Sequence, residues 1–109
     1  MPVFNGADYV AEAIESALAQ SATEVEVVAV DDGSTDATPA VLAGFGDRIR
    51  VVRKPNGGLS SARNAGIDAT TTELLGFLDA DDLLPREFAA SMLAAAAARP
   101  DVEVFHCGF

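Results

Sequence analysis

The chain has 109 residues, which makes one small domain or part of a larger one. Half of its residues are hydrophobic, so a real core can form, and this composition argues against global disorder. Its formal charge is −10, with seven Lys and Arg against 17 Asp and Glu. This balance argues against nucleic-acid backbones and anionic membrane surfaces as partners.

The single cysteine, Cys107, excludes an internal disulfide and a zinc site built from cysteines. No apolar run approaches the roughly 20 residues that a membrane span needs. The first residues also lack the basic and apolar regions of a signal peptide. These features together make a reducing cytoplasm the expected location.

Strand-like and helix-like segments alternate along the chain with short turns between them. In chain order, the sequence predicts a helix over 7–20, a strand over 25–30, a helix over 38–43, a strand over 49–53, a helix over 60–69, a strand over 74–78, a helix over 86–98 and a strand over 102–106. Because the strands are too apolar to alternate cleanly, this order favours an α/β fold with a parallel sheet covered on both faces.

The first six residues are typical of the turn that follows a strand, although no strand precedes them. An α/β chain of this kind is expected to open with an apolar strand before Pro2. In a doubly wound sheet that strand lies centrally, and its loss leaves unpaired edges that favour pairing with another copy.

An acidic motif, FLDADD at 77–82, follows the apolar run 74–78. Ligands of open α/β sheets bind beyond the carboxyl ends of the strands, where this motif is expected. On an extended segment, Asp79 and Asp81 point the same way and repel each other unless a cation lies between them. Mg²⁺ is held in this manner by one or two carboxylates plus substrate phosphates. A metal-bridged phosphate ligand is the first hypothesis, and a solvated acidic turn that caps the next helix is the alternative.

Two further polar segments follow predicted strands. In DDGSTD at 31–36, Asp32 can accept hydrogen bonds from a base or a ribose, although a plain turn and helix cap explains the same residues. The glycine turn at 56–58 leads into a helix N-terminus, an anion site to which Arg63 adds a positive charge. An ordinary turn with a surface arginine is the alternative there. The basic residues Arg48, Arg50, Arg53 and Lys54 are interpreted as a solvated strand rim, with a position facing a phosphate as the weaker alternative.

Five short segments, in this order and spacing, closely resemble family 2 glycosyltransferases. They are PVFN at 2–5, the Ser16 and Gln20 pair, DDGSTD at 31–36, NGG at 56–58 with ARNAG at 62–66, and FLDADD with Pro85. The match covers essentially the whole chain, so residues 1–109 correspond to the donor-binding, N-terminal half of the family's catalytic domain.

The resemblance implies a Rossmann-like GT-A fold that binds a nucleotide-diphosphate sugar together with Mg²⁺ or Mn²⁺. The residues expected to bind the donor nucleotide are Pro2, Phe4, Asn5, Asp31, Asp32, Arg63 and Asp79, and those expected to bind the metal are Asp79 and Asp81. In that assignment Asp32 contacts the base, Arg63 helps to hold the donor, and Asp81 ligates the metal on the diphosphate. Phe4 stands where the family usually has Tyr, so one hydroxyl is missing.

The resemblance also has gaps, because the family's first strand and its C-terminal half have no counterpart here. That half carries the acceptor site and the general base, a role that Asp82 does not take over. The resemblance implies that this chain is the donor-binding part of an inverting, metal-dependent transferase and is itself inactive or nearly so.

The donor expected from this resemblance is a UDP-sugar, and the acceptor is a hydroxyl of a saccharide or a lipid. The expected location is the cytoplasm, with a peripheral position at the inner membrane face as an option for a full-length parent. The alternative function is a non-catalytic nucleotide-binding or assembly module of the same fold. A phosphoryl-receiver domain is disfavoured, because no lysine follows Asp82.

Overall fold

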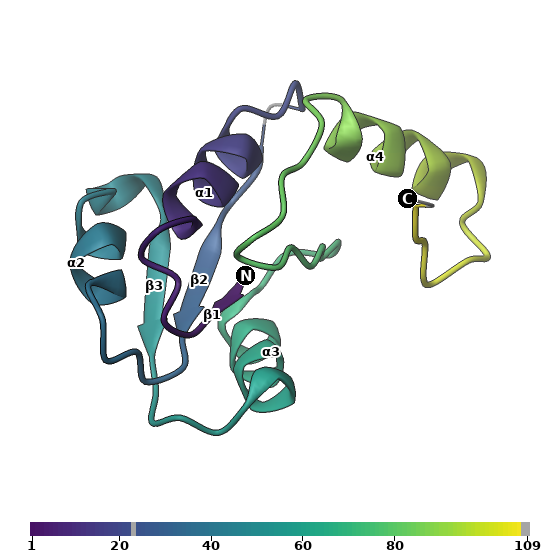
Figure 1. Cartoon of the computed structure of the whole chain (residues 1–109). Coiled ribbons are helices and arrows are strands. Elements are labelled where there is room, and N and C mark those ends of the chain that lie inside the picture. The colour runs from purple at the N-terminus through teal and green to yellow at the C-terminus, as the bar shows by residue number, and fades with distance from the viewer. Residues whose placement is uncertain (23, 108–109) are drawn as a thin grey trace.

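The fold is a small parallel sheet with helices on both faces. The computed structural model describes residues 1–22 and 24–107. Its elements in chain order are β1 (Pro2–Val3), α1 (Val10–Leu18), β2 (Val28–Asp31), α2 (Thr38–Ala43), the 3₁₀ helix η1 (Gly46–Arg48), β3 (Arg50–Arg53), α3 (Leu59–Ala69) and α4 (Phe88–Ala98) (Figure 1).

Strand β2 lies at the centre of the sheet, between β1 and β3, and both pairings are parallel. All four residues of β2 are buried. Successive side chains of a strand point to opposite faces. Val30 accordingly packs in one apolar cluster with Ala62 of α3, and Ala29 packs in another with Ile14 of α1 and Leu42 of α2. The strand is therefore covered on both faces, which explains the apolar residues at 28–30.

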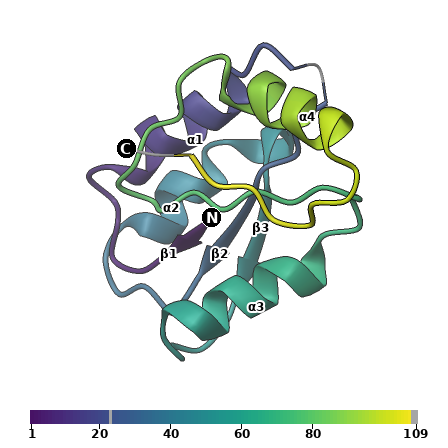
Figure 2. The ribbon, with the colours of Figure 1, turned by 90° about the vertical axis from the view of Figure 1, so that its right-hand side faces the viewer.

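The helices α1 and α2 cover one face of the sheet, and α3 covers the other (Figure 2). Helix α1 buries Val10, Ala13, Ile14 and Ala17, which recur at helical spacing. Within the described part of the chain, no helix is long and apolar enough to cross a membrane. The layer order predicted from the alternation of segments is thus confirmed, and the four predicted helices are present with shifts of one to three residues at some ends.

Two predicted strands are wrong. The segments 74–78 and 102–106 form no strand, and Leu74, Leu75 and Phe77 are 55%, 45% and 51% exposed. The physical reason for the first is that its expected neighbour, β1, is two residues long and offers few backbone groups for pairing. The strand predicted over 25–30 begins at Val28, because only 28–31 find partners in β3.

The prediction that the first strand is absent also needs correction. Pro2–Val3 form β1, in register with Val30 and Asp31 of β2. The N–H of Val30 donates to the carbonyl of Met1 at 2.8 Å, and the N–H of Asp32 donates to the carbonyl of Val3 at 2.9 Å. The expected edge of β2 is therefore paired within the described residues, over a short length.

Candidate functional site

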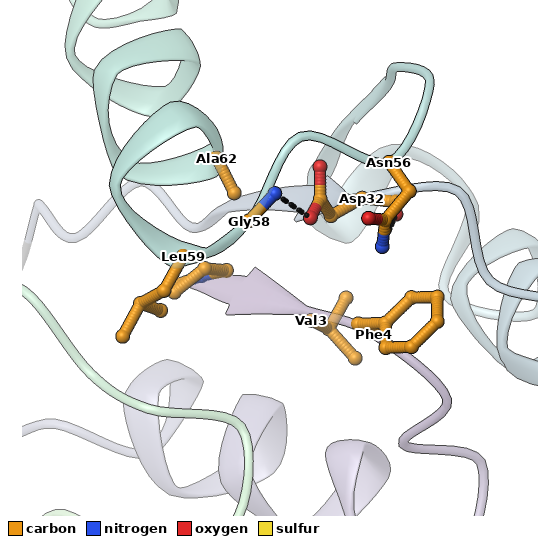
Figure 3. A pocket seen from close by; sticks show the side chains of 8 residues that line it. Val3, Phe4, Asp32, Asn56, Gly58, Leu59 and Ala62 are labelled. Carbon is orange, nitrogen blue, oxygen red and sulfur yellow. Dashed lines mark hydrogen bonds between the residues drawn. The ribbon is translucent and has the colours of Figure 1, made fainter.

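A pocket of about 180 Å³ lies at the carboxyl edge of the sheet (Figure 3). It is lined by Pro2, Val3, Phe4, Asp32, Asn56, Gly58, Leu59 and Ala62. These residues come from β1, the end of β2, the glycine turn and the start of α3. Pockets that hold drug-sized ligands measure roughly 300 to 1,000 Å³, so this smaller pocket has room for about one ring system and does not enclose an entire nucleotide sugar.

Asp32 is the charged residue of the pocket lining, and it is held rigidly. Its Oδ1 accepts hydrogen bonds from Lys54 Nζ at 2.7 Å and from the Gly57 N–H at 3.0 Å, while its Oδ2 accepts one from the Gly58 N–H at 2.9 Å. The hydrogen bond from Lys54 is the main reason why the pKa of Asp32 lies below its ordinary value; burial opposes this, and the two backbone donors add to it. Asp32 is thus an anionic acceptor with a fixed orientation.

Lys54 was missed as a site residue by the sequence analysis, which placed it on a solvated rim. Its side chain is 19% exposed and lies against Asp32, whereas the side chain of Arg53 is 60% exposed. Its position in the sequence could have identified it, because Lys54 directly follows β3 and therefore lies at the same edge of the sheet as Asp32.

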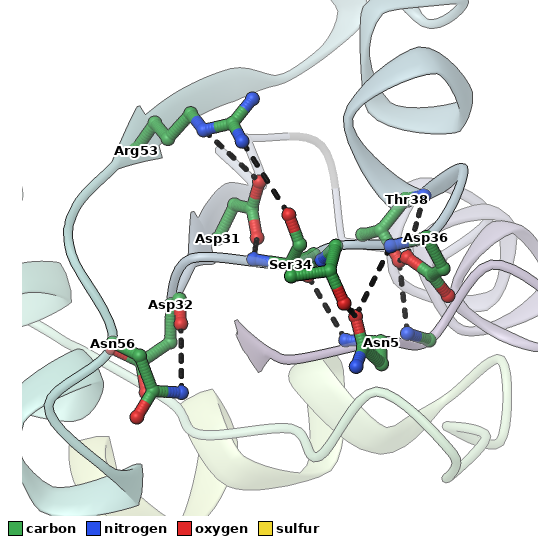
Figure 4. Close-up of polar contacts among 10 residues, drawn as sticks. Asn5, Asp31, Asp32, Ser34, Asp36, Thr38, Arg53 and Asn56 are labelled. Atoms are coloured by element: carbon green, nitrogen blue, oxygen red, sulfur yellow. Dashed lines mark hydrogen bonds and ion pairs between the residues drawn. The ribbon is translucent and has the colours of Figure 1, made fainter.

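Asp31 has a different environment from its neighbour. It is 1% exposed, and its Oδ1 accepts a hydrogen bond from the Ser34 N–H at 2.9 Å (Figure 4). Its Oδ2 has no hydrogen-bond partner among the described residues, and Arg53 Nε lies 3.8 Å away. Asp31 therefore stabilises the turn after β2 and is not part of the pocket lining, so its expected contact with a nucleotide stays a prediction.

Phe4 and Asn5, which follow β1, also differ from each other. Phe4 is 48% exposed and forms a wall of the pocket. Asn5 has a φ of +50°, and its Oδ1 accepts hydrogen bonds from the N–H groups of Thr35 at 2.8 Å and Asp36 at 3.3 Å (Figure 4). Its side chain thereby ties β1 to the loop after β2. A direct contact between Asn5 and a nucleotide remains a prediction.

The acidic motif forms a turn, in which the Asp82 N–H donates to the carbonyl of Asp79 at 3.0 Å. Within this turn Ala80 is buried, and Asp81 is exposed. The expected convergence of Asp79 and Asp81 assumed an extended segment, so that argument does not apply here. Among residues 1–22 and 24–107, no three His, Cys, Asp or Glu side chains gather closely enough to hold a metal ion. The expected binding of a metal ion by Asp79 and Asp81 therefore stays a prediction.

Arg63 connects the glycine turn region to the acidic turn. It lies on α3, and its Nη2 donates a hydrogen bond to Asp79 Oδ1 at 2.9 Å. Its Nε is buried and, within the part of the chain that the structure describes, has no hydrogen-bond partner. The structure thus brings together two of the residues predicted for donor binding, from segments 16 residues apart in the sequence.

Comparison with known proteins identifies the family. Residues 1–108 match the model of Glycosyl transferase family 2. The chain belongs to this family. It is 34% identical over 112 residues to the glycosyltransferase EpsJ of Bacillus subtilis, a match that covers 100% of the chain and 32% of EpsJ. It is 41% identical over 87 residues to chondroitin synthase of Pasteurella multocida, covering 77% of the chain and 9% of that enzyme.

Solved structures of S. aureus TarS share the fold of this chain. The complex of TarS 1-349 with UDP superposes with a TM-score of 0.83 at 27% identity, covering 91% of the chain and 31% of the TarS fragment. The complex with UDP-GlcNAc gives a TM-score of 0.76 at 29% identity, covering 92% and 30%. The predicted GT-A fold is therefore confirmed, and the family is one of transferases. The chain spans between 9% and 32% of the length of the two curated relatives named above.

Proposed function

We propose that this chain binds the nucleotide of a UDP-sugar and serves as the donor-binding part of an inverting glycosyltransferase. The observation that carries the proposal is the anionic, rigidly held Asp32 in a pocket with room for one ring. A base with a ring N–H, as in uracil, can donate to such a carboxylate, while Phe4 supplies an aromatic surface for stacking. The bound UDP and UDP-GlcNAc in the matching TarS structures support this choice of donor.

We also propose that Asp79 and Asp81 share a Mg²⁺ or Mn²⁺ ion with the donor diphosphate. Carboxylate oxygens are ligands that these ions prefer, and an ion of this kind is commonly held by one or two carboxylates plus substrate phosphates. A site with two carboxylates suits an ion whose other ligands come from the donor phosphates. The described residues offer no group of three or more His, Cys, Asp or Glu that could enclose an ion by themselves. When bound, the ion would neutralise charge on the departing diphosphate.

The remaining residues of the site have binding and orienting roles in this proposal. Arg63 holds the Asp79 carboxylate and presents positive charge to the diphosphate, and Lys54 fixes the Asp32 carboxylate through a hydrogen bond. The sugar would pass to a hydroxyl of a saccharide or lipid acceptor, with inversion. Such a transfer needs a general base within hydrogen-bond reach of that hydroxyl, and we assign none of the described residues to this role.

Calorimetry tests the proposal on the chain itself. UDP titrated in the presence of Mn²⁺ should bind, and Asp32→Asn should weaken binding at least tenfold, because a neutral amide replaces the anionic acceptor. The matched control is Asp47→Asn, since Asp47 is exposed on η1 and outside the pocket. A folded chain that does not bind UDP would contradict the proposal and favour a non-catalytic assembly module.

A further inference from the structure

The end of α1 is tied to the segment that follows the acidic turn. Ser16 Oγ accepts a hydrogen bond from the Leu84 N–H at 3.1 Å. Gln20, just beyond the helix, donates from Nε2 to the carbonyl of Pro85 at 2.9 Å and accepts from the Ala89 N–H through Oε1 at 2.8 Å. One short stretch of chain thus holds three backbone groups that are 65 to 69 residues away in the sequence.

The Gln20 amide is almost fully used by these contacts. The residue is 9% exposed, and Nε2 also donates to the carbonyl of Ser16 at 3.1 Å. The Ala89 N–H belongs to the first turn of α4, where backbone donors have no partner within the helix. Gln20 therefore caps α4 from another element and bridges the corner between Pro85 and Ala89.

These contacts lie close to the acidic turn. Leu84, the residue bound by Ser16, is two positions after Asp82 and three after Asp81. The run before the turn makes no ladder with β1, so the sheet does not fix the position of Asp79 and Asp81 as a strand would. The turn is held instead by Arg63 on Asp79 and by the burial of Ala80 in the core, against which Leu84 also packs. On the far side it is held by Ser16 and Gln20, together with the backbone N–H of Ser21, which donates to the carbonyl of Arg86 at 2.9 Å.

We infer that Ser16 and Gln20 are positioning residues for the metal-binding carboxylates. By fixing 84–89 on the end of α1, they set the place of Asp79 and Asp81 relative to the pocket, so that a metal ion can bridge the turn and a bound diphosphate. This inference rests on the proposed function. Ser16 and Gln20 do not line the pocket, and the inference gives these two residues a role in the site.

A merely structural role and a positioning role predict different measurements. If the pair only stabilises the fold, its loss should affect all properties of the chain in proportion to the loss of stability. If it positions the carboxylates, its loss should weaken the metal-dependent part of donor binding and spare the metal-free part, because the pocket around Asp32 does not contact 84–89. Loss of partners that orient metal ligands typically costs about 10- to 100-fold in metal affinity.

The experiment measures the affinity of the full chain for UDP by calorimetry, once with Mn²⁺ and once with EDTA. Gln20→Met keeps the length of the side chain and removes both of its hydrogen-bonding groups, and Ser16→Ala removes the acceptor for Leu84. Ile14→Val is the matched control, because it lowers the stability of the core beneath α1 and leaves the hydrogen bonds from Ser16 and Gln20 to 84–89 in place. Ser16→Thr retains the hydroxyl. Hydrogen exchange of the Asp82 amide reports on the turn without any ligand.

We expect Gln20→Met and Ser16→Ala to reduce the gain in UDP affinity from Mn²⁺ about tenfold and to speed exchange of the Asp82 amide, with metal-free UDP affinity within twofold of the unchanged chain. Ser16→Thr and Ile14→Val should retain the gain. If Gln20→Met retains the gain in UDP affinity from Mn²⁺, as Ile14→Val should, this inference is overturned and the proposed function still stands. An unchanged chain that binds UDP without any gain from Mn²⁺ would overturn the metal part of the proposed function, and this inference with it.

Discussion

The guanidinium of Arg63 lies 2.9 Å from the carboxylate of Asp79, so that α3 and the acidic turn are joined by an ion pair. Their side chains are 37% and 46% exposed. Ion pairs with such access to water contribute little to stability, typically about 0 to 1 kcal/mol. The pair therefore contributes little to the stability of the fold, and in the proposed function its two charged groups act on the donor and the metal ion.

Arg63→Ala should consequently separate binding from stability. We expect the affinity for UDP with Mn²⁺ to fall at least tenfold, because the positive charge facing the diphosphate is lost, while the free energy of unfolding changes by no more than about 1 kcal/mol. Calorimetry and urea unfolding measure the two quantities. Arg86→Ala is the control, since Arg86 is exposed and lies outside the pocket. A large loss of stability with unchanged affinity would refute the assignment.

Lys54→Met should change how the stability of the fold depends on pH. The pKa of Asp32 in the folded chain is below its ordinary value, chiefly because Lys54 donates a hydrogen bond to it. A lowered pKa stabilises the fold above the ordinary Asp pKa of about 3.9, and this contribution is lost as the pH falls through the lowered pKa. Without Lys54 the pKa of Asp32 rises towards its ordinary value, so the fold of Lys54→Met loses less stability when the pH falls.

The difference in stability between the unchanged chain and Lys54→Met should therefore be full at pH 7 and shrink below about pH 4. Urea unfolding at a series of pH values from 7 to 3 measures it. Arg86→Met, which removes a positive charge at an exposed position, should give a difference that does not shrink in this way. Parallel pH profiles for Lys54→Met and the unchanged chain would contradict the proposed role of Lys54.

The sequence predicted the layers of this fold because local patterns determine them. The β-branched run around β2 requires burial on both faces of the strand. The helical spacing of Val10, Ile14 and Ala17 requires burial on one face of α1. The acidic turn was harder to predict, because whether 74–78 pairs as a strand depends on the length of β1, which lies more than 70 residues earlier in the sequence. Apolarity alone predicts burial and carries no information about a distant partner.

Within the site, too, features set by local sequence were predicted and contacts between distant segments were not. Asp32 was predicted from its position after a strand, and the structure places it in the pocket. Lys54 was missed, because its partner lies 22 residues earlier in the sequence and a charged residue after a strand is more often solvated. The anchoring of 84–89 by Gln20 spans 65 residues and was likewise beyond any local pattern.

Gly33→Ala should destabilise the turn that presents Asp32. Gly33 has a φ of +78°, and a Cβ at this position would lie 2.7 Å from the backbone nitrogen of Asn56. The change adds both backbone strain and a clash with main chain, so we expect a loss of about 1 to 3 kcal/mol in the free energy of unfolding. Gly76→Ala is the control, because a Cβ there meets nothing within 4 Å. Equal stability of the two variants in urea would contradict the close approach of the Gly33 turn to Asn56.

Phe4→Ala should weaken nucleotide binding with little effect on the fold. Phe4 is 48% exposed and forms a wall of the pocket, so its aromatic ring is available to a base. Stacking of a base on an aromatic side chain contributes about 1 to 3 kcal/mol, which corresponds to a roughly 5- to 150-fold loss of UDP affinity in calorimetry. Phe77→Ala is the matched control, because Phe77 is 51% exposed and outside the pocket lining. Phe4→Tyr retains the ring and should bind UDP at least as well as the unchanged chain. Equal affinities for Phe4→Ala and Phe77→Ala would show that the base lies elsewhere.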